Sequence, residues 1–494
     1  MSTLHLPPAG SGSGKNEPST SRRWLKPRVP KEQLFRLAPP RPKRKLLGRL
    51  ERIDQFRSLV RAWWIWLALA VLLLESGHWS IAAIAGVLSF LFFHTSPARH
   101  AAIYALEPDL DTSSVEFRET MEGTTGMHWV DGNAVTIFNN GDQFYPAMLN
   151  AIDSARFSIT MEQYIFWDGA IGRRFAESVA ERSRQGVQVK LLVDAVGSST
   201  LGNEVLRILE TGGCQLAWFQ PIRWYTLNRA NHRTHRKSLI MDGAVAFTGG
   251  AGLADQWIGS ARSKYEWRDI QIRVEGPAAL AQQSGFAQNW LVTTGEVLTG
   301  TSFFPVAPPA GNIQVQTILS SPHQGTGAAG TVTAIALQSS SKYVWIANPY
   351  FIPDFRYLEM LSNAGQRGVA IKLIVAGNHS DTWWARQNSL RLYGKLFKAG
   401  VEIYEYMPTM LHQKVMIVDG AWGSVGTANF DNRSIALNEE TTVCVHDRVL
   451  IGELEAAFLA DLARSKRVAA VDWHRRSILQ RTKEQLAALI EDQV

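Results

Sequence analysis

The sequence contains one uncommon pattern twice: a histidine, a lysine two residues later, and an aspartate five residues after the lysine. The copies are HRKSLIMD at 235–242 and HQKVMIVD at 412–419. Each copy is followed at the same offset by a small-residue turn, Gly249-Gly250 in the first and Gly426-Thr427 in the second. A spaced set of reactive side chains that occurs twice indicates a catalytic unit duplicated within one chain.

The sequence around the two motifs is repeated as well. GVQVKLLV at 186–193 matches GVAIKLIV at 368–375, and each stretch predicts a helix end followed by a buried strand. Strands alternate with helices in both halves, which favours an α/β fold. We therefore predict two α/β/α sandwich halves at 107–300 and 301–480, related by a pseudo-twofold axis, with a C-terminal helix end at 481–494.

Each motif places its histidine and lysine at alternate positions of a strand, so both side chains project from one face. Pairing the halves brings His235, Lys237, His412 and Lys414 to one cleft. The two lysines would neutralise the anionic oxygens of a phosphodiester and the charge that grows in the transition state. One imidazole would attack phosphorus while the other protonates the departing alkoxide. This chemistry needs no metal or cofactor, and the symmetric pattern leaves open which histidine attacks.

Two carboxylates are candidates for orienting these histidines. Alignment of the repeats places Asp269 and Glu440 at the same position, each beside a strand that follows its motif. A carboxylate that accepts from imidazole Nδ1–H fixes the tautomer and leaves Nε2 to react. The alternative is that both are surface carboxylates at the start of a strand.

Four further residues complete the predicted site. Thr427 and Asn429 are expected to donate hydrogen bonds to the phosphate of the substrate. Asp242 and Asp419 close the two motifs, each at the end of the motif strand. Because this position lies past the strand, we expect both aspartates to anchor the following turn rather than to contact substrate.

The doubled motif resembles that of the phospholipase D superfamily, and its surroundings are similar to those of bacterial cardiolipin synthases. The similarity covers roughly residues 130 to 470. The segments that carry it are IFNNGD at 137–142, EQYIF at 162–166, RTHRK at 233–237, NPYFIP at 348–353 and NFDNRS at 429–434. One departure is visible, because Gly252 stands where the family usually has the asparagine found at Asn429 in the second half.

The resemblance implies a membrane-associated phosphatidyltransferase that makes cardiolipin from phosphatidylglycerol and a second phospholipid. It also implies a phosphohistidine intermediate, with His235 as the nucleophile and His412 as the general acid and base. The substrates would be phospholipids, including anionic ones such as phosphatidylglycerol. The sequence does not fix the oligomeric state.

The charge of the chain is concentrated at its N-terminus. Residues 1–61 hold 15 Lys or Arg and 4 Asp or Glu, which gives this segment a net charge of +11. The net charge of the whole chain is +7, so the remaining residues carry −4. This tail is rich in Pro, Gly and Ser, which predicts disorder over much of its length. A solvated linker is the simple interpretation, and a polybasic arm beside an anionic membrane is the alternative that the next segment favours.

Residues 62–93 form the long apolar region of the chain, interrupted by Glu75 to His78. A single helix over all 32 residues would reach about 48 Å, whereas a hydrocarbon core is about 30 Å thick. We therefore expect a membrane-associated helical hairpin, with a single tilted span or a buried soluble hairpin as alternatives. A hairpin returns the catalytic halves to the side of the basic tail, which predicts the cytoplasmic face of a bacterial inner membrane.

Three other functions compete with phosphatidyl transfer. A phospholipase D that hydrolyses phospholipids to phosphatidic acid would use the same site, with water as the acceptor. A nuclease is disfavoured because nucleic-acid grooves are normally basic and residues 62–494 carry −4. A non-catalytic membrane scaffold is disfavoured because both motifs are intact. We therefore expect no nucleic-acid partner.

Two aromatic stretches lie close to the motifs, at 218–225 and 382–384. Trp and Tyr favour the headgroup layer of a membrane because their rings are amphipathic. Both stretches are candidates for lips that face the membrane, and core packing is the competing interpretation.

Overall fold

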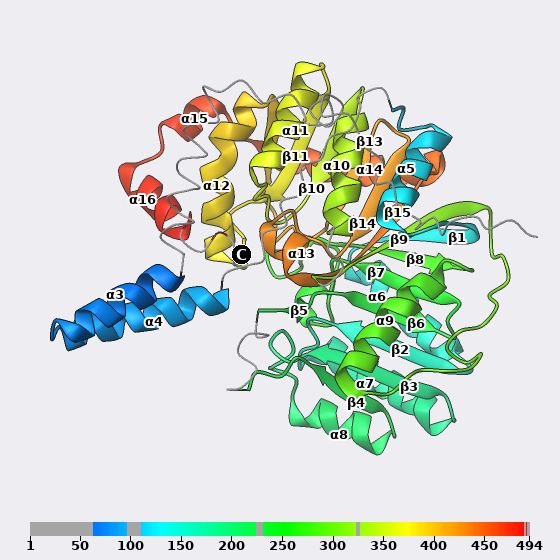
Figure 1. Ribbon diagram of the computed structural model, residues 1–494. Coiled ribbons are helices and arrows are strands. Elements are labelled where there is room, and N and C mark those ends of the chain that lie inside the picture. Colours follow the sequence, from blue (N-terminus) through cyan, green and yellow to red (C-terminus); the bar gives the residue numbers. More distant parts are fainter. Residues whose placement is uncertain (1–62, 96–109, 224–230, 323–326, 489–490, 492–494) are drawn as a thin grey trace, which may run out of the picture. The chain divides into compact units, whose positions relative to one another are not determined.

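The computed structural model describes residues 63–95, 110–223, 231–322, 327–488 and 491. One 16-stranded sheet runs through both halves of the catalytic region (Figure 1). The strands before the midpoint of the repeat are β1 (Trp129–Asn139), β2 (Ser158–Gln163), β3 (Gln188–Asp194), β4 (Gln215–Phe219), β5 (Arg233–Thr234), β6 (Lys237–Met241), β7 (Val245–Gly249) and β8 (Ile270–Glu275). Those after it are β9 (Ile313–Ser320), β10 (Tyr343–Ala347), β11 (Ala370–Ala376), β12 (Val401–Tyr406), β13 (Val415–Val418), β14 (Trp422–Gly426), β15 (Asn438–Val445) and β16 (Ser465–Arg467).

The strand order is symmetric about the centre of the sheet. It reads β12-β11-β10-β13-β14-β15-β9 on one side and β1-β8-β7-β6-β2-β3-β4 on the other, with β16 added at one edge. Three neighbouring strands of each half are parallel, β2-β3-β4 and β10-β11-β12, and the motif strands β6 and β13 run antiparallel to their neighbours β2 and β10. The antiparallel pair β1 and β9 joins the halves. The duplication predicted from the sequence is therefore confirmed.

Helices pack on the sheet in both halves. Those of the first half are α6 (Gly141–Ser154), α7 (Ala170–Arg184), α8 (Asn203–Thr211), the 3-10 turn η2 (Asp255–Trp257) and α9 (Ala279–Thr294). Those of the second half are α10 (Ala328–Ser339), α11 (Phe355–Gln366), α12 (Trp383–Lys398), α13 (Asn432–Ala436), α14 (Arg448–Ala463), α15 (Ala470–His474) and α16 (Ile478–Ala487).

The helices cover both faces of the sheet, which gives each half three layers. Leu191 on β3 packs in the cluster of α6 and α7, whereas Leu192, the next residue, packs in the cluster of α9. On β11, Leu373 packs in the cluster of α10 and α11, whereas Ile374 packs in the cluster of α14. Successive strand residues point to opposite faces, so burial on both faces explains the continuous apolar runs of β3 and β11.

One helix crosses between the halves. Helix α5 (Val115–Thr125) falls within the range 107–300 predicted for the first half, but it packs against the second half. The ring of Phe117 meets that of Trp422 edge-on with centroids 6.5 Å apart, and Arg118 bonds the ring of His446 at 3.2 Å. The connection between α9 and β9 spans residues 295–312, and the boundary predicted at residue 300 falls within it.

The apolar segment forms two helices, α3 (Trp63–Glu75) and α4 (Trp79–Thr95), joined at Ser76 to His78. Gly77 takes φ +80° in that turn, a backbone conformation that glycine adopts at little cost. Ten large apolar side chains between Leu67 and Phe90 are 40–70% exposed. No helix in the described part of the chain is both long and apolar enough to cross a membrane by itself. The basic tail predicted at 1–61 lies outside the described residues.

Candidate active site

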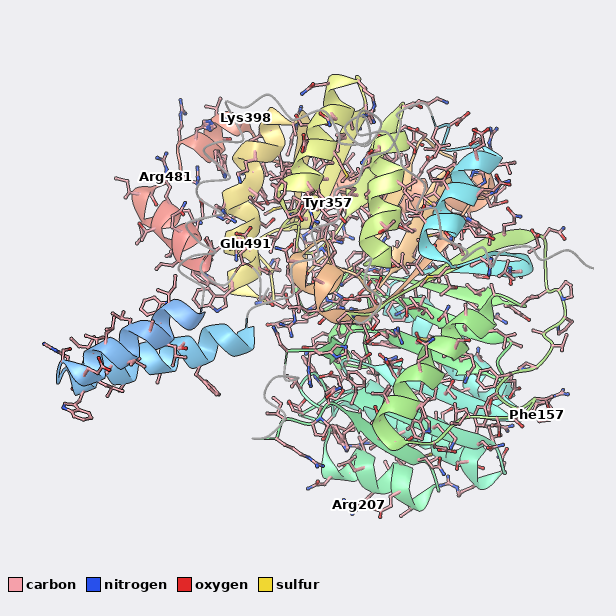
Figure 2. The ribbon with its side chains drawn as sticks, viewed as in Figure 1. Phe157, Arg207, Tyr357, Lys398, Arg481 and Glu491 are labelled. Carbon is pink, nitrogen blue, oxygen red and sulfur yellow. The ribbon has the colours of Figure 1, made fainter. Side chains whose placement is uncertain are left out.

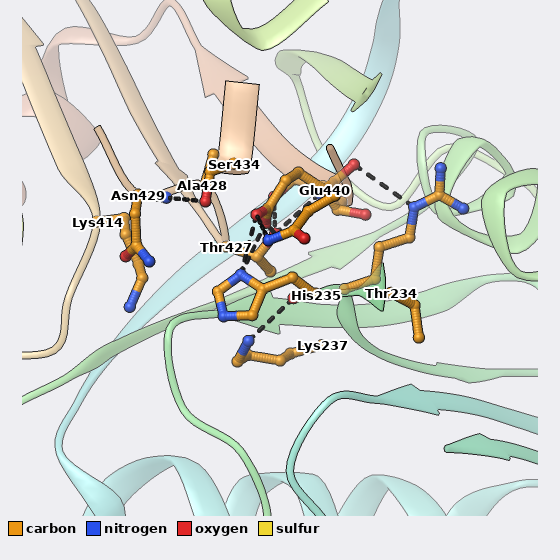
Figure 3. A network of polar contacts seen from close by, with 12 residues as sticks. Thr234, His235, Lys237, Lys414, Thr427, Ala428, Asn429, Ser434 and Glu440 are labelled. Atoms are coloured by element: carbon orange, nitrogen blue, oxygen red, sulfur yellow. Dashed lines mark hydrogen bonds and ion pairs between the residues drawn. The ribbon is translucent and has the colours of Figure 1, made fainter. Parts of the chain in front are cut away.

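The two motifs meet where the two halves meet, and Figure 3 shows His235 and Lys237 of the first motif with Lys414 of the second. His235 and His412 stand just before β6 and β13, and none of the four residues is more than 8% exposed. Each histidine is held by the backbone of the other half. The amide of His235 donates to the carbonyl of Glu439 at 2.9 Å, and the amide of His412 donates to the carbonyl of Arg268 at 2.8 Å. The cleft therefore exists only when the halves are paired.

The histidine–carboxylate pairs are also crossed between the halves. His235 Nδ1 lies 3.0 Å from both carboxylate oxygens of Glu440, and His412 Nδ1 lies 3.0 Å from Asp269 Oδ2. Burial alone would raise the pKa of Glu440, but His235 and Lys237 outweigh it and lower that pKa to about 2. An ionised acceptor at Nδ1 leaves Nε2 of each ring as the reactive nitrogen.

The pKa of each histidine is depressed. Burial lowers the pKa of His235 to about 4, although Glu440 opposes that shift, and burial with the charge of Lys414 lowers the pKa of His412. A neutral imidazole is what nucleophilic attack by His235 requires, whereas a bound anion would oppose the shift at His412 and favour the proton that a general acid must carry.

The two lysines are buried cations held by backbone carbonyls. Lys237 Nζ donates to the carbonyl of His235 at 2.9 Å, and Lys414 Nζ donates to that of His412 at 2.5 Å. Burial and the charge of Lys414 lower the pKa of Lys237 to about 7, and burial lowers that of Lys414 to about 8. A bound phosphate anion would offset both causes, so this arrangement is suited to an anionic substrate.

The two motif aspartates lie at the far end of their strands. Asp242 accepts the backbone N–H groups of residues 156–158, and Asp419 accepts those of residues 341–343. Both have positive φ, +53° and +56°, in the turn that follows the motif strand. Neither contacts the cleft, as expected, and each joins its motif strand to the start of the neighbouring strand.

Thr427 differs from its expected role. Its hydroxyl donates to Glu440 and also accepts from the amide of Thr441 at 2.9 Å. The hydroxyl is thus occupied by the protein, and Thr427 holds the carboxylate that orients His235 instead of facing phosphate. The cause is the antiparallel pairing of β14 with β15, in which Gly426 faces Thr442 and residue 427 therefore lies beside residue 441.

Asn429 and Gly252 make the site asymmetric. The Oδ1 atom of Asn429 is buried without a protein partner among the described residues, and its side chain lines a cavity together with Lys414 and Asn348. At Gly252 a Cβ would lie 2.8 Å from Ile165 Cβ and 2.9 Å from the Ile165 carbonyl oxygen. The first half therefore has no room for the missing amide unless its backbone moves.

Three aromatic residues next to the histidines were not predicted. Trp257 Nε1 donates to Asp269 Oδ2 at 2.9 Å, and the rings of Trp257 and Trp267 lie 5.3 and 5.5 Å from that of His412. The ring of Tyr164 lies 5.0 Å from that of His235. Trp267 could have been suspected because it stands two residues before Asp269. Trp257 could not, because the turn η2 brings it back from 12 residues away.

Two buried ion pairs lie beside the crossed contacts. Arg236 Nη2 pairs with Glu439 across the halves at 2.9 Å, and Arg268 Nε pairs with Asp461 across the halves at 2.9 Å. All four side chains are at most 5% exposed, so removing one partner would leave an uncompensated buried charge. These pairs hold the two histidine-bearing segments against the opposite half.

The matching family model and the similar curated proteins belong to the same family. A family model described as a cardiolipin synthase, phospholipase D-like domain, matches residues 148–281 and 334–462. A cardiolipin synthase of Oceanobacillus iheyensis is 32% identical over 364 residues, which cover 73% of this chain and 75% of that protein. Cardiolipin synthase 1 of Bacillus cereus is 29% identical over 392 residues, covering 77% and 76%.

A solved structure shares the fold. The phosphatidylserine synthase of Haemophilus influenzae Rd KW20 superposes with a TM-score of 0.60 at 12% identity, over 77% of this chain and all of that one. At that identity the similarity shows the fold alone.

Replacing Trp257 should separate the support of His412 from the packing around it. Trp257→Phe keeps a ring but removes the donor to Asp269, so we expect kcat to fall on the order of tenfold with KM nearly unchanged. Asp269 raises the pKa of His412. Without the Trp257 indole as a donor, the Asp269 carboxylate should raise the pKa of His412 further. The pH–rate profile should therefore move toward higher pH.

Trp473→Phe is the matched control, because the Trp473 indole donates to the carbonyl of Leu390 at 2.8 Å, away from the cleft. We expect its kinetics and pH profile to equal those of the wild type. Unchanged kcat and pH profile in Trp257→Phe would contradict a role for the indole in supporting His412.

Proposed function

The chain belongs to the cardiolipin synthase family of phospholipase D-like proteins, and from that premise we propose that it is a phosphatidyltransferase that makes cardiolipin. It takes a phosphatidyl group from phosphatidylglycerol or a second phospholipid and joins it to the headgroup hydroxyl of phosphatidylglycerol. The observation that carries the proposal is the crossed pair of histidines beside two buried lysines. Such a site is suited to a phosphodiester and to attack by nitrogen.

In the first step His235 Nε2 attacks the phosphorus of the donor lipid. A P–N bond forms and the P–O bond to the headgroup breaks, while protonated His412 gives its proton to the departing alkoxide. Glu440 at Nδ1 stabilises the charge that develops on the His235 ring. The products of this step are a phosphatidyl-histidine and a free alcohol such as glycerol.

In the second step His412 removes the proton of an acceptor hydroxyl. The acceptor oxygen attacks phosphorus, the P–N bond breaks, and His235 returns to its neutral form. His412 is protonated again, which restores the starting state. Lys237 and Lys414 stabilise the phosphoryl oxygens in both steps, and protonation of both is favoured by the anion itself.

The acceptor decides the outcome of this chemistry. A lipid hydroxyl gives cardiolipin, whereas water gives phosphatidic acid by the same two steps. The curated relatives named above are cardiolipin synthases, which supports transfer over hydrolysis.

Membrane attachment through α3 and α4 is part of the proposal. Apolar side chains are exposed on both helices, a surface that stays stable in water only when it is covered. Helices of 13 and 17 residues span about 20 and 26 Å, so the hairpin would dip into one leaflet or cross a locally thinned bilayer. The positive charge of residues 1–61 favours the cytoplasmic face of a bacterial inner membrane for the attached enzyme.

The reaction can be tested with the purified full chain and defined lipids. Phosphatidylglycerol alone should give cardiolipin and glycerol in equal amounts without added nucleotide or metal, as measured by mass spectrometry. A phosphatidyl label that is stable in base and lost in acid should appear on His235 and be absent from His235→Ala. Phosphatidic acid as the only lipid product would replace the transferase with a hydrolase.

Two truncations test the attachment to membranes. Removing residues 1–61 deletes +11 of charge but keeps the hairpin, so the protein should stay membrane-bound and lose selectivity for anionic lipid. Each basic residue near an anionic surface contributes on the order of 1 kcal/mol, screened by salt. Removing residues 1–94 should release much of the catalytic region. Sedimentation with vesicles measures both, and a soluble protein after the shorter truncation would contradict the hairpin as the anchor.

A further inference from the structure

The loops at the two edges of the sheet differ in composition. The parallel strands of both halves end at the edge where His235 and His412 stand, because the motif strands run antiparallel to them. Five large apolar residues that are 39–56% exposed follow those strand ends. They are Val196 after β3, Ile222 after β4, Phe355 after β10, and Trp383 and Trp384 after β11. We call this set the apolar rim.

At the opposite edge, the turns that lead into the parallel strands consist mostly of small and polar residues. These turns are Gln185-Gly186, Gly212-Gly213, Ser341-Lys342, Arg367-Gly368 and Ala399-Gly400. Phe157, before β2, lies on the surface of the first half (Figure 2), and Leu291, Val292 and Val297 around the end of α9 are further exposed apolar residues near this edge. The two adjacent tryptophans and Phe355 lie at the edge that holds the motif histidines, and the first half adds Val196 and Ile222 to the apolar rim.

The segment that carries the two tryptophans is fixed to the cleft. The buried Tyr350 donates its hydroxyl to Asp381 and lies 3.3 Å from the hydroxyl of Thr382. Arg386 Nη1 donates to the carbonyl of Ala376 at 2.9 Å, which ties the start of α12 to the end of β11. Asn348, two residues before Tyr350, lines the cavity beside Lys414.

The two indoles meet edge-on, with ring centroids 4.7 Å apart. Each is 44% exposed although an adjacent residue, Ala385, is fully buried. Exposed tryptophans on a fixed backbone fit a partner that is apolar on one side and polar on the other.

A phospholipid bilayer has that chemistry at its headgroup layer. The four motif residues are at most 8% exposed, so a lipid phosphate has to leave the headgroup layer to reach them while its acyl chains stay in an apolar phase. We propose that the apolar rim inserts into the headgroup layer of a phospholipid bilayer and holds the mouth of the cleft against it. This inference rests on the proposed lipid substrate, and it assigns the rim a role separate from that of α3 and α4.

The test compares one enzyme on two physical forms of the same substrate. The full chain is reconstituted in phosphatidylcholine vesicles, and phosphatidylglycerol is supplied either within the bilayer or as a short-chain monomer in water. Trp383→Ser/Trp384→Ser should lower kcat/KM for bilayer phosphatidylglycerol by about tenfold or more. The rate on the monomeric substrate should stay within about twofold of the wild type, because that substrate needs no docking.

Leu291→Ser/Val292→Ser is the matched control. These two neighbouring residues are exposed apolar side chains near the end of α9. They lie at the opposite edge, since Lys190 near the start of β3 pairs with Glu296 at 2.8 Å. Both substrates should be turned over by this variant as by the wild type. Unchanged bilayer activity in the tryptophan variant would overturn the proposal, and so would an equal loss on both substrates.

A readout without turnover separates this inference from the proposed function. A fluorophore attached at Trp383→Cys should be quenched by brominated lipid, whereas one at Val292→Cys should not, in a Cys214→Ser background. If the fluorophore at position 383 is quenched but the protein transfers no phosphatidyl group, insertion of the apolar rim is supported and the proposed phosphatidyltransferase function is rejected. Absence of quenching, or a change of oligomeric state in the tryptophan variant, would reject the rim in favour of core packing or a second copy of the chain.

Discussion

The crossed pairing of histidine and carboxylate is the contact on which the rest of the site depends. Glu440 of the second half supports His235 of the first, and Asp269 of the first half supports His412 of the second. All four groups are buried, and a buried charge without its partner costs several kcal/mol. Neither half can therefore hold a competent histidine alone, which explains why the duplicated units share one continuous sheet.

The two halves are similar in backbone but not in chemistry. The ring of His412 lies beside those of Trp257 and Trp267, and its carboxylate accepts an indole N–H. His235 faces Tyr164 instead, and its carboxylate is held by Thr427. Two histidines with different supports are free to take different parts of one reaction. This asymmetry agrees with a division into a nucleophile and a general acid and base.

The sequence predicted the parts of the molecule that repeat. Two copies of the motif and of the preceding strand were enough for the duplicated α/β/α sandwich and the meeting of His235 with His412. It failed where a contact depends on a turn or on the other half. Thr427 was expected at phosphate but bonds Glu440, Trp257 returns to the cleft through η2, and α5 packs across the halves. Such contacts leave no periodic signal in one chain.

The central claim is that both histidines serve one reaction in one shared site. The direct measurement is the rate of phosphatidyl transfer by His235→Ala, His412→Ala and the double variant, each checked for folding by its thermal unfolding midpoint. Residues that act as a unit are not additive, so each single variant should lose essentially all transfer and the double variant should be scarcely worse. Full transfer by either single variant, or losses that multiply in the double variant, would contradict a shared site.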